Sequence, residues 1–116
     1  MLAAIGGVVA LAWLAPLVAF TTWLGSALAF ATAGLLLGVP TGVWYHVRLR
    51  ACLTARGALP PHWWLRPVAL HGRLTPDERA DVQRWFFAGG AGFVLTAIGC
   101  ALGGIGVAVE LLRPTP

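Results

Sequence analysis

Three histidines are the side chains in this chain that are best suited to bind a cofactor or to transfer protons. His46 follows Trp44 and Tyr45 at the end of a long apolar run, and His62 and His71 lie in a proline-rich segment. Paired histidines can hold haem b, and a histidine beside aromatic rings can bind a quinone head group. Because no histidine lies in the middle of an apolar run, we expect no cofactor. A quinone or haem b near His46, Tyr45 and Trp44 stays as an alternative.

Glu110 is the one acid within an apolar run, near the C-terminal end of the chain. An ionisable residue inside a membrane helix is by default a functional hypothesis, so ion coupling at Glu110 is one interpretation. Arg113 follows three residues later, on the same helix face. We favour an ion pair between these two residues at the membrane interface.

Cys52 and Cys100 are expected to be free thiols. In a membrane they would differ in depth by about half a bilayer, roughly 15 Å, whereas a disulfide needs Cα atoms within about 7 Å. The chain has no CxxC, GxSxG, HExxH or P-loop motif. We therefore expect no metal site and no catalytic residue, and we favour a non-catalytic role.

The composition indicates that the histidines, Glu110 and the cysteines lie on or beside membrane helices. Of the 116 residues, 59% are hydrophobic and 10% are charged, whereas a soluble domain carries roughly 25% charged residues. Such a chain cannot cover a water-facing surface with polar groups. We therefore expect an all-α integral membrane protein in the inner (cytoplasmic) membrane of a bacterium. Its net charge of +4 comes from arginines between apolar runs, which fits anionic lipid head groups rather than nucleic acid.

Three transmembrane spans are predicted. Residues 86–109 form an uncharged run of 24, and a span needs about 20. The first 47 residues carry no charge, yet as one helix they would be about 70 Å long, more than twice the hydrocarbon thickness. We predict an N-terminal helical hairpin, with span 1 at about 2–21 and span 2 at about 26–46. Its turn falls at Thr21–Ser26, around Gly25, with Trp23 at the lipid interface. Two spans remain the alternative.

The segment between the apolar runs is expected in the cytoplasm, because residues 47–85 hold seven of the eight arginines. Three spans would place the N-terminus inside and the C-terminus outside, and two spans would place both ends outside. The Pro- and Trp-rich loop 47–75 is expected to lie along the membrane surface, or else against a partner subunit. The lipid-interface candidates are Arg48, Arg50, Trp63, Trp64, Arg66, Arg84 and Trp85.

One long helix is predicted from about 76 to 112, containing span 3 at 86–109. Thr75 and Glu78 have the spacing of a capping box, and Pro76 suits the first helical position.

Glycines recur at helical spacing on both sides of the loop. Small residues let helix backbones approach closely in lipid. We favour packing of spans 2 and 3 within one chain, and contacts with other membrane subunits or a homo-oligomer are the alternatives. The helix-packing candidates are Gly34, Gly38, Gly42, Gly92, Gly99, Gly103 and Gly106.

Three features of the sequence favour an accessory or assembly subunit of a larger inner-membrane complex. The apolar runs contain few ionisable groups, two helix faces carry small residues, and the loop is short and aromatic. A homo-oligomeric small channel or transporter is the second hypothesis. A quinone- or haem-contacting subunit of a respiratory or photosynthetic redox complex is the third.

Overall fold

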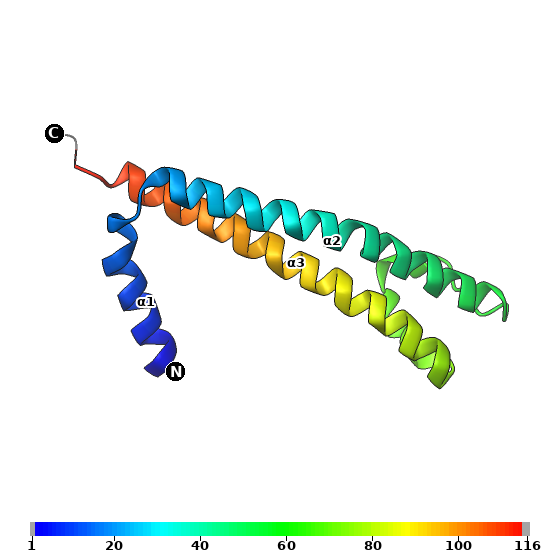
Figure 1. The fold of residues 1–116 in the computed structure, drawn as a ribbon. Coiled ribbons are helices and arrows are strands. Elements are labelled where there is room, and N and C mark those ends of the chain that lie inside the picture. Colours follow the sequence, from blue (N-terminus) through cyan, green and yellow to red (C-terminus); the bar gives the residue numbers. More distant parts are fainter. Residues whose placement is uncertain (1, 115–116) are drawn as a thin grey trace. The chain divides into compact units, whose positions relative to one another are not determined.

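The computed structural model describes residues 2–114, and this part of the chain is helical without strands, which confirms the expected all-α class. Its α-helices are α1 (Leu2–Leu14), α2 (Phe20–Thr54) and α3 (Pro76–Leu111) (Figure 1). The 3-10 helices are η1 (Ala15–Leu17), η2 (Trp63–Leu65) and η3 (Pro67–Arg73). The chain divides into two compact units, a loop unit, Gly34–Val94, and a terminal unit, Met1–Ala33 with Leu95–Pro116.

The two long helices, α2 and α3, are long and apolar enough to cross a membrane. They have 35 and 36 residues, hence about 50 Å each, against roughly 30 Å of hydrocarbon. Their most apolar 18-residue stretches have mean hydropathies of 1.6 and 2.1, and only 17% of each stretch is buried. The rest of the chain therefore leaves most of these apolar side chains uncovered.

The predicted turn at Thr21–Ser26 is wrong, because these residues are helical and the chain bends at 15–19 instead. Pro16 lies at the start of η1 within this bend, and its ring and missing amide proton disfavour the continuation of α1. Trp23, which we expected at the lipid interface, is buried against the chain, and its Nε1 donates to the carbonyl of Ala15 at 3.4 Å. Its depth in a membrane stays a prediction.

Because of this bend, α1 has only 13 residues, or about 20 Å, which is shorter than a span requires. The expected span 1 over 2–21 is thus divided between α1, η1 and the start of α2. Only α2 and α3 among the described residues have spanning length, so the count of three spans is not confirmed.

The second helix is longer than its expected range of 26–46, and the loop expected from residue 47 begins eight residues later. Leu49 and Leu53 are buried in these extra turns. Gly57, at φ +62°, ends the helix, with Ala58 N donating to Leu53 O and Gly57 N to Thr54 O. This is a Schellman arrangement, and the left-handed backbone it needs is one that glycine adopts without strain.

The third helix begins as the sequence predicts. The Thr75 amide donates to Glu78 Oε2 at 3.0 Å, and the Glu78 amide donates to Thr75 Oγ1 at 3.4 Å. This reciprocal pair satisfies two amide donors that a helix start leaves without partners. The helix ends at Leu111, one residue before the expected end at 112.

Within the loop unit, α2 and α3 lie antiparallel and touch through glycine backbone (Figure 1). A Cβ atom added to Gly92 would overlap the backbone of Gly38 and lie 2.7 Å from the carbonyl oxygen of Gly34. One turn further along, a Cβ on Gly89 would lie 3.4 Å from the Cα of Gly42. The two backbones therefore meet with no side chain between them.

Within the terminal unit, the glycines of α3 face larger partners on α2. A Cβ on Gly99 would lie 2.6 Å from the amide nitrogen of Ala31, and one on Gly106 would lie 2.5 Å from the Cβ of Trp23. Gly103 has the Cβ of Ala27 as its neighbour, at 3.5 Å. Alanine and tryptophan on α2 thus complement the glycines that the sequence singled out on α3.

We predict that Gly92→Ala destabilises the protein by about 1–3 kcal/mol, because the added methyl group forces apart two backbones in contact. Thermal unfolding in detergent micelles measures the effect. Gly90→Ala is the matched control, since a Cβ on Gly90 meets nothing within 4 Å, and its stability should be unchanged or slightly higher. Equal losses in the two variants would contradict the packing described.

Candidate functional site

A small apolar core closes the loop unit, where the last turns of α2 and the first turns of α3 meet the segment containing η2 and η3. Its buried members are Tyr45, Leu49, Leu53, Leu70, Leu74 and Val82. The proline-rich segment therefore folds back onto the helices through Leu70 and Leu74, and does not lie wholly along a surface as expected. Trp64 and Leu65 in the same segment remain exposed.

A tyrosine–histidine pair connects α2 to the loop inside this core. The Tyr45 hydroxyl lies 2.8 Å from Nε2 of His71 and donates the bond when that nitrogen carries no proton. The ring of Phe86 packs edge-on against His71, with centroids 5.7 Å apart. Burial, and secondly the charge of Arg79, lower the pKa of His71 below its ordinary value of 6.5. Burial and the nearby positive charge thus favour the neutral imidazole of His71.

The other two cofactor candidates lie beside this pair. His46 shares a hydrogen bond of 2.8 Å between its Nδ1 and the carbonyl of Gly42, one turn earlier. The ring of Tyr45 is 4.9 Å from that of His46, and Trp44 packs edge-on against Trp85 at 6.2 Å. The structure therefore gathers the three candidates, but the Tyr45 hydroxyl and His46 Nδ1 already bond to the chain itself. No group of three or more His, Cys, Asp or Glu among the described residues could hold a metal ion.

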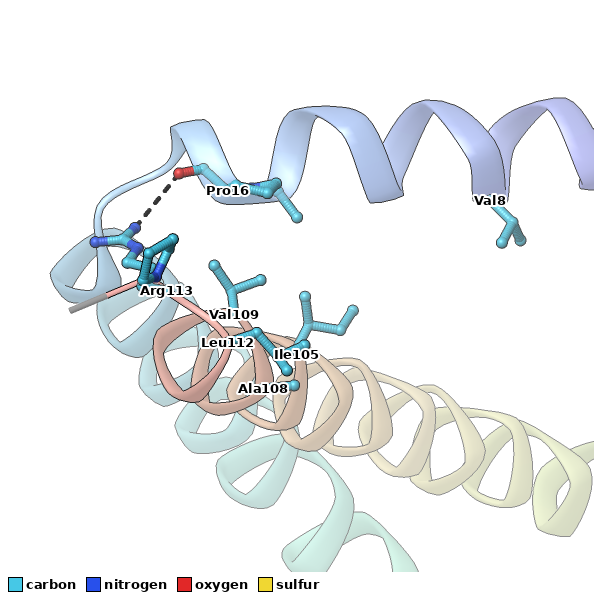
Figure 2. A pocket seen from close by; sticks show the side chains of 9 residues that line it. Val8, Pro16, Ile105, Ala108, Val109, Leu112 and Arg113 are labelled. Atoms are coloured by element: carbon cyan, nitrogen blue, oxygen red, sulfur yellow. Dashed lines mark hydrogen bonds between the residues drawn. The ribbon is translucent and has the colours of Figure 1, made fainter.

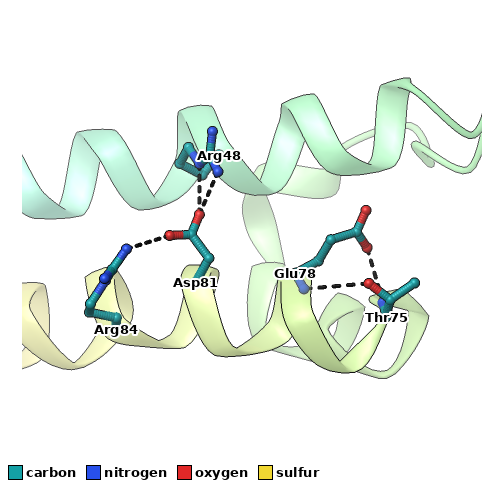
Figure 3. Close-up of polar contacts among 5 residues, drawn as sticks. All are labelled: Arg48, Thr75, Glu78, Asp81 and Arg84. Atoms are coloured by element: carbon teal, nitrogen blue, oxygen red, sulfur yellow. Dashed lines mark hydrogen bonds and ion pairs between the residues drawn. The ribbon is translucent and has the colours of Figure 1, made fainter.

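Asp81 joins the two long helices through two arginines, as Figure 3 shows. Arg48 of α2 donates from Nε to Asp81 Oδ2 at 2.8 Å, and Arg84 donates to Oδ1 at 2.6 Å. The hydrogen bond from Arg48 contributes most to lowering the pKa of Asp81. The carboxylate is therefore ionised at neutral pH, and it neutralises part of the arginine charge at this end of the unit.

Three further arginines fasten the loop. Arg56 pairs with Glu78 and also donates to the carbonyl of Arg73 at 2.8 Å. Arg73 donates in turn to Ala58 O, and Arg79 donates to His71 O. Their guanidinium groups therefore connect the carbonyls of Ala58, His71 and Arg73 in the loop to side chains of α3 and of the loop itself.

The predicted lipid-interface residues divide into two groups. Arg48 and Arg84 bind Asp81, and the guanidinium of Arg84 lies 5.7 Å from the ring centre of Trp85. By contrast, Arg50 and Arg66 are exposed, and their guanidinium groups have no hydrogen bond or ion pair with any residue that the structure describes. Trp63 packs against the core, and Trp64 is exposed.

A groove of about 600 Å³ lies on α2 beside these tryptophans. Apolar residues and glycine line its length, and polar side chains occur at the loop end. The lining residues are Gly38, Val39, Gly42, Val43, His46, Val47, Arg50, Trp63 and Trp64. The groove thus combines a long apolar wall with one cation.

In the terminal unit, Glu110 forms an ion pair with Arg113 at 3.2 Å, the pairing that we favoured. Arg113 also donates to the carbonyls of Val18 at 2.8 Å and Pro16 at 3.5 Å. It closes an apolar cavity of about 590 Å³ between α1 and α3 (Figure 2). In Figure 2, Val8 faces this cavity from α1 and Ile105 faces it from α3.

The sequence reasoning missed Asp81 as the acid that bridges two arginines, and it missed His71 as the partner of Tyr45. The spacing of Asp81 and Arg84 on one helix face was a usable signal. No local signal points from Tyr45 to His71, 26 residues away. Both cysteines are free thiols, as predicted. Comparisons with protein-family models, curated proteins and solved structures give no match to this chain.

The lowered pKa of His71 predicts acid sensitivity. The folded chain binds a proton at His71 at lower pH than the unfolded chain does, so this contribution to stability is complete above about pH 6.5 and is lost as the pH falls further. His71→Gln cannot titrate, and we expect a shallower fall in unfolding free energy between about pH 7.5 and 5.5. Chemical denaturation in detergent measures both curves.

His62→Gln is the control, because the His62 side chain is exposed and makes no hydrogen bond or ion pair with the described residues. That variant should keep the wild-type pH dependence. Identical curves for wild type and His71→Gln would show that the Tyr45–His71 pair does not carry the effect.

Proposed function

We propose that this chain is a small, non-catalytic integral membrane protein that serves as an accessory or assembly subunit of a larger complex in the inner membrane of a bacterium. The observation that carries the proposal is the uncovered apolar surface of α2 and α3. Large side chains on both helices are exposed, including Leu36 at 72% and Phe93 at 74%. In water this exposed apolar surface would cause the protein to aggregate. Lipid or neighbouring subunits cover the same surface without aggregation.

The topology that we propose is a hairpin of two spans, α2 and α3, with the loop between them in the cytoplasm. The arginines of the loop unit, paired and unpaired, support a cytoplasmic location of the loop, because short arginine-rich loops are retained in the cytoplasm. The 13-residue α1 is too short to cross, and we place it in the opposite interfacial region. The first and last described residues would then lie outside.

The subunit role follows from how the chain uses its small residues. The contacting glycines pair α2 with α3 inside each unit, which leaves the bulky apolar faces outward. Helices associate in lipid through packing rather than through hydrophobic drive, so these faces suit either lipid or helices of another protein. Ion pairs of Arg48 and Arg84 with Asp81, and of Arg56 with Glu78, hold the loop end, and this gives that end a fixed shape that a partner can recognise.

Purification from the native host tests the role. The full chain, tagged at one end, should co-migrate in mild detergent with a defined set of other membrane proteins, in an assembly larger than a monomer. Paired Leu36→Ala and Phe93→Ala substitutions should weaken that assembly, while Leu112→Ala, exposed but beyond the end of α3, should not. A homogeneous assembly of this chain alone would contradict the proposal and favour the channel or transporter hypothesis.

A further inference from the structure

The guanidinium groups of two arginines in the loop unit have no partner among the residues that the structure describes. Six of the eight arginines donate to carboxylates or carbonyls, and Arg50 and Arg66 do not among the described residues. Arg50 differs from Arg66 because it lies at the end of the apolar groove on α2. An exposed guanidinium at the mouth of such a groove indicates an anionic, amphiphilic ligand.

The groove follows one face of α2. Two rows with a spacing of four residues form it, Gly38–Gly42–His46–Arg50 and Val39–Val43–Val47. At Gly42, an added Cβ would meet nothing within 4 Å, so the missing side chain leaves open space. The Gly42 carbonyl already binds His46 Nδ1, which leaves the wall apolar up to the level of the imidazole.

We propose that this groove binds one anionic phospholipid, with an acyl chain along the Gly38–Val47 wall and the phosphate on Arg50. The assignment rests on the proposed membrane placement. Gly38 and Arg50 are twelve residues apart, or about 18 Å along the helix, close to the roughly 15 Å depth of one leaflet. The groove therefore has the length of a single lipid tail in the leaflet that faces the loop.

The residues at the loop end of the groove favour a phosphate as the ligand. Arginine binds phosphate oxygens in a bidentate manner, and the groove lining contains no carboxylate that would repel an anion. Trp63 and Trp64 flank the mouth, and indole rings favour the head-group level of a bilayer. A quinone carries no charge and would leave Arg50 without a partner, so the anionic lipid fits better.

Native mass spectrometry of the full chain in detergent, with added phosphatidylglycerol or phosphatidylcholine, tests the proposal. We expect one phosphatidylglycerol to be retained, and Arg50→Gln to bind it about tenfold more weakly. Arg66→Gln is the matched control, because it removes the other unpaired arginine outside the groove, and it should bind as the wild type does. Phosphatidylcholine should be retained less than phosphatidylglycerol by the wild type.

A second pair of variants tests the groove independently of charge. Gly42→Leu fills the apolar wall and should reduce lipid retention to a similar degree. Gly104→Leu adds the same side chain at a glycine of α3 that also has nothing within 4 Å, and it should leave retention unchanged. Circular dichroism verifies that both variants keep the helical content of the wild type.

Equal retention by wild type, Arg50→Gln and Gly42→Leu would overturn the proposal, as would a co-purified quinone displaced by Gly42→Leu. Carbonate extraction of membranes separates this failure from failure of the proposed function. A chain that resists extraction but shows no groove-dependent lipid contradicts only the lipid site. A chain released by carbonate contradicts the membrane placement itself.

Discussion

The close contact between Gly38 and Gly92 is the constraint on which the loop unit depends. A Cβ on Gly92 would overlap the opposite backbone, and a Cβ on Gly38 would lie in tight contact, 3.2 Å from the carbonyl carbon of Gly92. This contact fixes the register of the two antiparallel helices. In that register Arg48 meets Asp81 and Tyr45 meets Phe86. A shift by one turn would break the ion pair and the aromatic packing together.

The loop end shows how a short segment between two long helices gains a defined structure. Leu49, Leu53 and Val82 are fully buried, and the loop carbonyls are satisfied by arginine side chains. Surface ion pairs contribute little singly, about 0–1 kcal/mol each, so burial of the leucines supplies most of the stability. The arginines chiefly specify which loop conformation forms.

The sequence predicted the features that depend on local pattern. The helix from Pro76 and its Thr75–Glu78 capping box follow from residue type and spacing alone. The bend near Pro16 was missed, because the most polar stretch was preferred over the proline as the helix breaker. The end of α2 at Thr54 was missed because Leu49 and Leu53 are buried by a loop that folds back. The pairing of Tyr45 with His71 depends on that tertiary fold, and no periodicity encodes it.

The central claim is that lipid surrounds the middle of α2 and that water surrounds its loop end. Power-saturation electron paramagnetic resonance in reconstituted bilayers tests it, with single nitroxides at Leu36, Val43 and Ala55, all of them exposed. The account predicts that oxygen dominates relaxation at Leu36 and Val43, and that a water-soluble nickel reagent dominates at Ala55. Nickel-dominated relaxation at all three positions would contradict it.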